Sequence, residues 1–389
     1  MTETLPGTPA ADGFRMPAEF EPHAGCWMLW PERPDNWRAA ARPAQLTFAQ
    51  VAAAIAQFEP VTVGVSNPHY TAARALLPAG VRVVEMAHDD AWMRDVGPTC
   101  VADVRGAVRG VDWRFNAWGG LEGGLYFPWD QDDLVARKVL EIERLDRYRA
   151  PLVNEGGAIH VDGEGTALVT EECLLNPNRN PTLAREDVEQ QLRAYLGVTH
   201  VIWLGKGVFN DETDGHIDNL ACFVCPGEVC LAWSERPRDP QSAISRDAWE
   251  RLNDARDGRG RRLKITRLPM PGPLTLSARE ARGIVGRERT RARVAGERLA
   301  ASYVNFYISN GGIIMPLLDA RTDRLAARRL KRLFPARRVV GVAAREILLG
   351  GGNIHCITQQ IPAARRSRQL AARPRWRRPT GSAPPRQLS

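Results

Sequence analysis

A cysteine that follows a run of glycines is the best candidate for a nucleophile in this chain. Cys356 comes directly after Gly350-Gly-Gly-Asn-Ile-His355, and glycines allow a backbone to approach a ligand closely. A thiolate can attack an unreactive carbon at neutral pH, where a serine alkoxide is hard to generate. A buried structural cysteine is the usual explanation of a lone thiol, so the catalytic interpretation depends on the residues that accompany it.

Three acidic residues in separate glycine-rich or polar segments are suited to binding a flat cation. They are Asp95, Glu155 and Asp218. A guanidinium group is planar and carries N–H donors in a fixed fork, which carboxylates bind strongly and orient. Three carboxylates would hold the nitrogens and leave the central carbon open to a thiolate. The residues therefore predict hydrolysis of a small substrate's guanidinium group, releasing ammonia and leaving a urea.

A histidine near the third of these acids can move the protons that the reaction needs. His216 would protonate the departing ammonia and then take a proton from the water that cleaves the covalent intermediate. If Asp214-Gly-His-Ile-Asp218 is extended, Asp214, His216 and Asp218 lie on one side of the strand. A hydrogen-bonded structural histidine in a loop is the alternative.

Other candidate sites are weaker. Cys222, Cys225 and Cys230 resemble half a zinc site, but a second pair at suitable spacing is absent, and the surrounding residues predict a hairpin of two buried strands. The sequence contains no Gly-x-Gly-x-x-Gly after a strand, no phosphate loop and no Gly-x-Ser-x-Gly elbow. We therefore expect neither a metal nor a nucleotide cofactor.

The positive net charge is concentrated at the C-terminus. Of 53 basic residues, eight arginines and no acid fall within residues 361–389, and subtracting them leaves 45 basic against 45 acidic residues. A neutral body argues against a specific nucleic-acid partner. Residues 361–389 are dominated by Pro, Arg, Ala and Ser, which predicts a disordered tail.

The remaining composition indicates a cytoplasmic protein with no membrane partner. No apolar run of about 18 residues is present, and residues 1–13 lack the basic start and apolar stretch of a secretory signal. Seven scattered cysteines are typical of reduced thiols and not of a disulfide scaffold.

Helical and strand periodicities alternate, which predicts an α/β fold. A helix over 44–58 precedes a strand at 61–65, a helix from 180 to 196 precedes a strand at 198–204, and a helix over 321–334 precedes a strand at 338–342. The polar segments flank apolar strands, and Cys356 is expected at the end of one. Their uneven separations suggest a repeat without demonstrating it.

Seven segments carry a resemblance to a known family, and the resemblance runs from about Met16 to Gln360. They are Met16-Pro-Ala-Glu-Phe-Glu-Pro-His23, Trp92-Met-Arg-Asp95, Asp112-Trp-Arg-Phe-Asn-Ala-Trp-Gly-Gly120, Asn154-Glu-Gly-Gly157, Thr170-Glu-Glu-Cys-Leu-Leu-Asn-Pro-Asn-Arg-Asn-Pro181, Asp214-Gly-His-Ile-Asp218 and Gly350-Gly-Gly-Asn-Ile-His-Cys356. The chain resembles the agmatine deiminases, members of the guanidino-group-modifying superfamily called penteins. The resemblance implies a five-bladed α/β propeller with a central polar pocket, formed by one catalytic domain over 16–360 that follows a flexible N-terminus over 1–15.

The resemblance also implies roles and a reaction. Cys356 would carry an amidino-cysteine intermediate, His216 would be the general acid and base, and Glu155 would partner both the guanidinium and His216. Asp95 and Asp218 would hold the guanidinium nitrogens. Agmatine and water would give N-carbamoylputrescine and ammonia, in polyamine (putrescine) biosynthesis or agmatine breakdown. Related enzymes imply a homodimer or larger homo-oligomer.

Agmatine ends in an ammonium without an α-carboxylate, so its pocket should offer acids or aromatic faces. Glu212 is the best candidate for that end, with Asp211 and Asp214 as weaker ones, and Trp92 is expected to pack along the methylene chain. The alternatives are a deiminase acting on arginine or peptidyl-arginine, an amidinotransferase, and a catalytically impaired homologue that binds polyamines.

Overall fold

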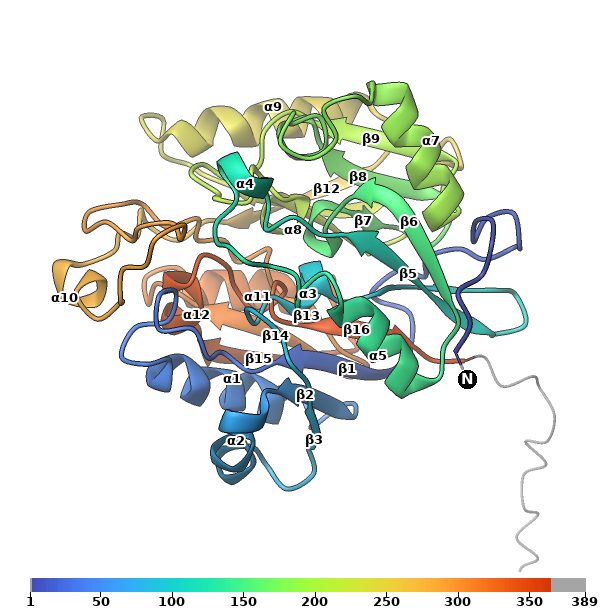
Figure 1. The fold of residues 1–389 in the computed structure, drawn as a ribbon. Coiled ribbons are helices and arrows are strands. Elements are labelled where there is room, and N and C mark those ends of the chain that lie inside the picture. Colours follow the sequence, from blue (N-terminus) through green and yellow to red (C-terminus); the bar gives the residue numbers. More distant parts are fainter. Residues whose placement is uncertain (1, 365–389) are drawn as a thin grey trace, which may run out of the picture.

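The computed structural model describes residues 2–364 of the chain, and this part contains five units of the same topology. In each unit a first strand pairs antiparallel with a second strand, and a helix then leads to a third strand that lies parallel to the second. A parallel pair requires a crossover, which the helix provides, whereas the antiparallel pair needs only a short turn. This confirms the α/β class, and the five units form the blades that the resemblance implies (Figure 1).

Each unit is a continuous segment of the chain, except that the first strand of unit one, β16, comes from the C-terminal end. Unit one contains β16 (Gln359–Pro362), β1 (His23–Leu29), α1 (Arg42–Ile55) and β2 (Val61–Val65), with η1 (Asn67–His69), α2 (Tyr70–Leu76) and β3 (Arg82–Glu85) added at its edge. Unit two contains α3 (Met93–Val96), β4 (Thr99–Ala102), β5 (Val108–Arg114), α4 (Gly120–Gly123), α5 (Val135–Glu143) and β6 (Arg147–Val153). Unit three contains η2 (Gly156–Ala158), β7 (His160–Val161), β8 (Thr166–Thr170), α6 (Glu171–Leu174), α7 (Arg185–Leu196) and β9 (His200–Leu204). Unit four contains α8 (Ile217–Leu220), β10 (Ala221–Cys225), β11 (Glu228–Trp233), α9 (Pro240–Asp254) and β12 (Lys264–Pro269). Unit five contains α10 (Ala278–Ala281), β13 (Tyr307–Ile308), β14 (Gly312–Leu317), α11 (Asp323–Leu333) and β15 (Arg338–Ala343), and α12 (Arg345–Leu349) leads back to β16.

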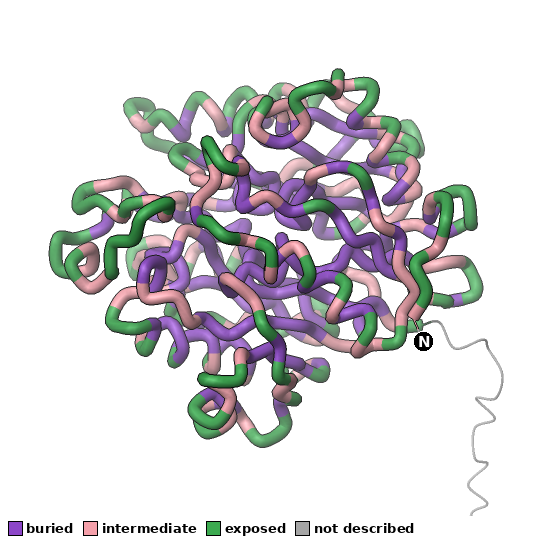
Figure 2. The backbone as a smooth tube through the Cα atoms, in the orientation of Figure 1, coloured by how far each residue is buried: buried purple, intermediate pink, exposed green. Residues whose placement is uncertain are grey.

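The first sheet joins the two ends of the described chain. Its first strand, β16, comes from the C-terminal end and pairs antiparallel with β1, which lies near the N-terminus. All four residues of β16 are buried. Buried residues are concentrated in the strands and the segments between them, and exposed residues lie mostly on the outer loops and helices (Figure 2). The C-terminal strand therefore completes the first blade.

The predicted helix and strand pairs are confirmed, with shifted boundaries. The second predicted helix begins at Arg185 and not at 180, because the Asn180 side chain is bonded to both the N–H and the C=O of Val153 and holds a loop there. Gly197 ends α7 with φ 66°, a left-handed conformation that glycine adopts without steric cost. The predicted hairpin is also present, because β10 pairs antiparallel with β11.

Both predicted domain boundaries differ from the structure. Residues 2–15, which we expected to be flexible, lie against the body: Leu5 donates to the Arg147 carbonyl, and Phe14 is buried. Leu5 and Phe14 pack in a hydrophobic cluster shared by units two and three, a contact that composition does not predict. Ile361 and Pro362 belong to β16 and not to the tail, and residues 365–389 lie outside the described residues. None of the described helices is both long and apolar enough to cross a membrane.

Candidate active site

The predicted site residues occupy equivalent positions in four of the five units, and Asn305, which was not predicted, occupies that position in the fifth. Each unit contributes from the segment that precedes its first strand: Asp95 before β4, Glu155 before β7, His216 and Asp218 before β10, Asn305 before β13, and Cys356 before β16. In Figure 1 the labels α3, α8, β13 and β16 gather towards the middle of the molecule. The pseudo-fivefold arrangement thus brings residues that are far apart in sequence to one centre.

The candidate nucleophile lies in a turn, and the expected strand before it is absent. The apolar residues Ile347–Leu349 form the end of α12, so Cys356 follows a helix and a glycine turn. The prediction failed because a short apolar run does not distinguish strand from helix. The Cys356 Sγ lies 3.2 Å from Nδ2 of Asn305 and 3.6 Å from Oδ2 of Asp218. An amide and a carboxylate therefore contact the sulfur.

Two glycines before the cysteine are required by close contacts. A Cβ on Gly351, whose φ is 110°, would lie 1.7 Å from Oε1 of Glu212. A Cβ on Gly352 would lie 2.4 Å from the ring of Trp92 and 3.0 Å from Cβ of Cys356. The glycine backbone thus runs from Glu212 past Trp92 to the thiol, with no room for side chains.

Around Gly157 the histidine and two of the acids converge. A Cβ on this glycine would lie 2.5 Å from Nδ1 of His216, 2.8 Å from Oδ1 of Asp95 and 3.1 Å from Oδ2 of Asp218. The other ring nitrogen of His216, Nε2, lies 3.3 Å from Oε2 of Glu155. Since Oδ2 of Asp218 also contacts the sulfur of Cys356, all five predicted residues surround one buried centre.

Burial and neighbouring charges set the protonation states of these groups. Burial, with the negative charges of Asp218 and Asp95, raises the pKa of the Cys356 thiol well above its ordinary value. Burial opposes the charged form of His216, but Asp95, Cys173 and Glu155 raise the pKa of its ring well above the ordinary value. These shifts favour a neutral thiol and an imidazolium at neutral pH.

The two carboxylates beside His216 are held differently. Oδ1 of Asp95 accepts the N–H of Gly157 at 2.9 Å, and Oδ2 accepts Nε1 of Trp118 at 3.1 Å. Burial and the nearby carboxylates raise the pKa of Asp95 to about 6. Burial likewise opposes ionisation of Glu155, but the guanidinium of Arg179, 2.8 Å from Oε1, lowers its pKa to about 2. Both are ionised at neutral pH.

Arg179→Ala should destabilise the fold strongly. Arg179 and Glu155 have fully buried side chains, and removing one partner of a buried pair leaves an uncompensated charge at a cost of roughly 3–5 kcal/mol. Urea denaturation would measure the free energy of unfolding. Arg185→Ala is the matched control. Arg185 pairs with Glu171, and both side chains are partly exposed, so the free energy of unfolding should fall by about 1 kcal/mol or less. Equal losses of unfolding free energy in the two variants would contradict a stabilising role for the buried pair of Arg179 and Glu155.

The two carboxylate oxygens of Asp218 differ, because one accepts a hydrogen bond and the other does not. Oδ2 accepts Nδ1 of His355 at 2.9 Å, whereas Oδ1 is buried without a hydrogen-bond partner among the described residues. Buried acceptors are usually satisfied. An unpartnered carboxylate oxygen beside the thiol is therefore a ready acceptor for a substrate N–H group.

Glu212, the candidate for the substrate's far end, is paired with two arginines. Arg293 donates to both of its oxygens, at 2.5 and 2.8 Å, and Nε of Arg291 lies 3.2 Å from Oε2. A small cavity bounded by these three residues also contacts Trp92 and Trp118. Trp92, which was predicted to pack along the substrate, thus lies between Cys356 and Glu212. Its Nε1–H donates a hydrogen bond to Asp90.

Asp211 and Asp214 lie beside the centre, and among the described residues neither is hydrogen-bonded to its thiol, its imidazole or its three carboxylates. Asp211 accepts the backbone N–H and hydroxyl of Thr213 and the side chain of Asn219. Asp214 accepts from Asn178 and Arg179. The extended alternation predicted over 214–218 is wrong, because Asp214 has φ 62° and Ile217 begins α8. A left-handed residue turns Asp214 away from His216 and Asp218.

Sequence reasoning missed several residues that touch the site, among them His355, which is hydrogen-bonded to Asp218. Asn305 contacts Cys356, Arg179 pairs with Glu155, and Trp118 bonds Asp95. Arg179 and Trp118 lie in segments that already carried the family resemblance. Nothing in the sequence around Asn305 marks it, apart from its place before the first strand of a repeat that was not recognised.

A ring of ββαβ units around a buried thiol, imidazole and carboxylates defines the class of guanidino-group-modifying enzymes. The model of the Porphyromonas-type peptidyl-arginine deiminase family matches residues 15–362. An agmatine deiminase of Pseudomonas aeruginosa is 59% identical over 362 residues, which are 92% of this chain and 98% of that protein. A solved agmatine deiminase of Enterococcus faecalis has 48% identity and a TM-score of 0.91, covering 94% of this chain and all of that one. The C. jejuni agmatine deiminase, at 24% identity and a TM-score of 0.75 over 90% of this chain and 97% of its own, supports the fold alone. The chain belongs to the Porphyromonas-type peptidyl-arginine deiminase family, within which its similar relatives are agmatine deiminases.

Proposed function

We propose that this chain hydrolyses agmatine to N-carbamoylputrescine and ammonia through a covalent intermediate on Cys356. The observation that carries the proposal is the convergence of one thiol, one imidazolium and three carboxylates around a single buried centre. Such a centre is complementary to a flat cation with an electrophilic carbon. The names of the relatives support agmatine as that cation.

In the first half of the reaction a carbon–sulfur bond forms and ammonia leaves. Binding of the guanidinium brings positive charge against Asp95 and Asp218, so the pKa of the thiol falls and its proton passes to solvent. The thiolate adds to the central carbon. His216, already an imidazolium, gives its proton to one amino group, which departs as ammonia and leaves an amidino-cysteine.

In the second half water replaces the sulfur. His216 is now neutral and accepts a proton from a water molecule, whose oxygen adds to the amidino carbon. The carbon–sulfur bond breaks, and the hydroxyl proton passes to the departing thiolate, which gives the urea and restores the Cys356 thiol. His216 ends the cycle protonated. Glu155, ionised by Arg179, stabilises that form throughout.

Substrate choice depends on the small cavity at Glu212. The distal ammonium of agmatine is complementary to this carboxylate, and it must compete there with Arg293. Arginine is a second candidate substrate, because Arg291 and Arg293 can pair with its α-carboxylate in the same cavity. We place agmatine first on the strength of the relatives.

Ammonia release from agmatine, arginine and an arginine-containing peptide tests the function. We expect the highest kcat/KM with agmatine, and N-carbamoylputrescine as its product. Preference for arginine or the peptide would overturn the substrate assignment. An acceptor amine in the assay should remain unmodified, since transfer of the amidino group to it would indicate an amidinotransferase instead.

Glu212→Gln should raise KM for agmatine roughly 10–100-fold with a smaller effect on kcat. The change removes a charged hydrogen bond of about 1.5–3 kcal/mol that substrate and transition state share. A butylguanidine without the terminal amine is the matched control substrate, and its kinetics should be almost unchanged by the variant. Equal losses with both substrates would place Glu212 in the scaffold and not at the ammonium.

We also infer a cytoplasmic protein that assembles as a homodimer or larger oligomer. The support is the scattered cysteines of the chain, which are typical of reduced thiols, and the resemblance to the agmatine deiminases, which implies an oligomer. Light scattering of the purified protein would measure the oligomer, and a monomeric mass would contradict it.

A further inference from the structure

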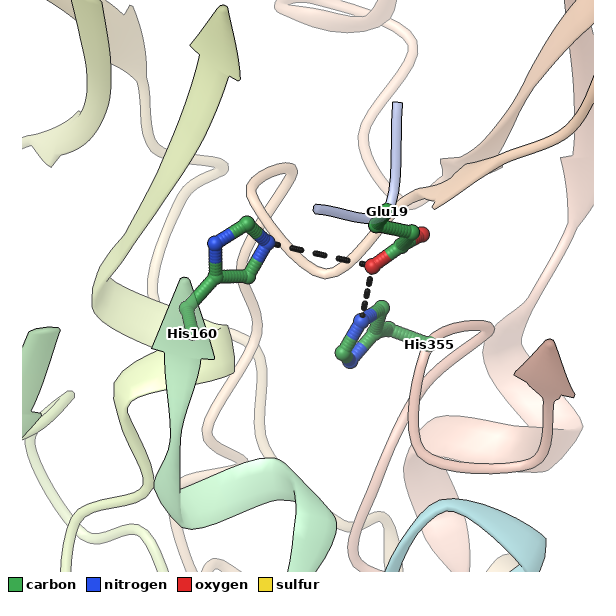
Figure 3. Close-up of side chains that lie close together, drawn as sticks. All are labelled: Glu19, His160 and His355. Carbon is green, nitrogen blue, oxygen red and sulfur yellow. Dashed lines mark hydrogen bonds and ion pairs between the residues drawn. The ribbon is translucent and has the colours of Figure 1, made fainter. Parts of the chain in front are cut away.

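His355, which directly precedes the candidate nucleophile, is buried between two carboxylates. Its Nδ1 lies 2.9 Å from Oδ2 of Asp218, and its Nε2 lies 2.7 Å from Oε2 of Glu19. Figure 3 shows the Glu19 carboxylate between the rings of His355 and His160. An ionised carboxylate only accepts hydrogen bonds, so both nitrogens of His355 must donate. Only the imidazolium form of the ring does this.

A metal ion is the other occupant that this cluster could hold. The possible ligand atoms of Glu19, His160 and His355 lie within 4.8 Å of one another. The geometry points away from a metal, because Nδ1 of His160 accepts the backbone N–H of Phe223. A neutral ring with an acceptor at Nδ1 carries its proton on Nε2, which then cannot bind a metal. Arg94, with Nη2 3.9 Å from Oε2 of Glu19, adds a cation to the same place.

The bond to Asp218 connects this cluster to the proposed chemistry. His355 occupies Oδ2, the oxygen that also contacts the sulfur of Cys356, and leaves Oδ1 unpartnered. Burial opposes ionisation of Asp218, but the hydrogen bond and charge of His355 hold its pKa below the ordinary value. Without that cation Asp218 would lie buried beside Asp95, and protonation would be favoured. A protonated Asp218 cannot pair with a guanidinium.

We propose that His355 is a positioning residue, an imidazolium held by Glu19 that keeps Asp218 ionised and directs its free oxygen to the substrate's guanidinium. This inference rests on the proposed function. The titratable and charged groups that face the pair come from several elements. They are Glu19 from the N-terminal segment, Arg94 and Asp95 from α3, His160 from β7, His216 beside α8, Cys222 from β10, and Cys356.

The first test observes the proton and does not depend on activity. In the full-length protein labelled with nitrogen-15 histidine, the signals lost in His355→Asn identify this ring. We expect both of its nitrogens to be protonated at neutral pH. A singly protonated ring would overturn the proposal, as would a stoichiometric metal ion in the purified protein that the His355→Asn variant lacks.

The second test is the pH dependence of kcat/KM for agmatine. Activity requires both Asp95 and Asp218 to be ionised. In the unaltered protein the acid limb belongs to Asp95, whose pKa is about 6, because Asp218 is already ionised there. Removing the cation raises the pKa of buried Asp218 past that of Asp95, and His355→Asn should therefore move the acid limb to higher pH by about one unit or more, equivalent to a tenfold loss on that limb. KM should rise more than kcat falls, and raising the pH should restore activity.

Two further variants separate positioning from a general role in the fold. Glu19→Gln keeps an acceptor for His355 but removes its charge, so it should move the acid limb in the same direction by a smaller amount. It also tests the proposal if His355→Asn fails to fold. His160→Asn changes the same cluster without touching Asp218 and should leave the acid limb in place. A uniform loss of activity at all pH values in His355→Asn, or an equal shift in His160→Asn, would overturn the proposal. If the unaltered protein hydrolyses no guanidine, the proposed function fails, while the nitrogen-15 result still decides the state of His355.

Discussion

Cys356→Ala should abolish ammonia release from agmatine, with a loss on the order of 10⁴-fold or more. The sulfur is the atom that bonds to the guanidinium carbon, and the Asn305 amide and Asp218 carboxylate beside it cannot replace it. Rapid acid quenching of the unaltered protein with agmatine should trap an adduct on the peptide that contains Cys356. The adduct should increase the mass of this peptide by the mass of agmatine less that of ammonia.

Cys225→Ala is the matched control for the nucleophile. Cys225 is an exposed thiol on the outer hairpin, whereas Cys356 is buried at the centre. The control variant should retain activity and still form the adduct. Retained turnover in Cys356→Ala, or an adduct on any other cysteine, would refute the covalent mechanism.

His216→Ala should lower kcat by roughly 10²–10⁴-fold, the range expected when a general acid and base is removed. The ring lies between Glu155 and Asp95, whose charges keep it protonated and ready to give a proton to the leaving ammonia. The variant keeps the nucleophile but lacks a proton donor for the first half and an acceptor for the second. Steady-state ammonia release would measure the loss.

A substrate with a better leaving group separates the two halves of the reaction, which are formation and hydrolysis of the Cys356 adduct. In the S-methylisothiourea analogue of agmatine, methanethiolate leaves without needing a proton from His216. The His216→Ala variant should therefore form the Cys356 adduct with this analogue and accumulate it, because hydrolysis still lacks its base. Adduct formation no faster than with agmatine would contradict the acid role. His69→Ala, on the 3-10 helix η1 away from the centre, should behave as the unaltered protein.

Local chemistry made the main site residues predictable. The chain has a thiol after three glycines, and it has one histidine and three acids in polar segments. These functional groups are the ones that guanidinium hydrolysis requires, so their types indicate the reaction wherever they lie in the fold. Periodicity likewise predicted the helix and strand pairs, since it reflects which face of each element is buried. It failed at Ile347–Leu349 and over 214–218, where short runs or left-handed residues override the pattern.

The sequence by itself determined which functional groups are present, the α/β alternation and the class of reaction that these groups can perform. Only the tertiary structure decided how they act together, because the relevant contacts join distant parts of the chain. Glu19 meets His355 across 336 residues, and Asn305 meets Cys356 across 51. The protonation states of Cys356, His216 and Asp218 arise from burial and charges at these contacts, which no local pattern encodes. Glu212 was predictable as an acid near the site, but its pairing with Arg291 and Arg293 depends on how unit five folds over the centre.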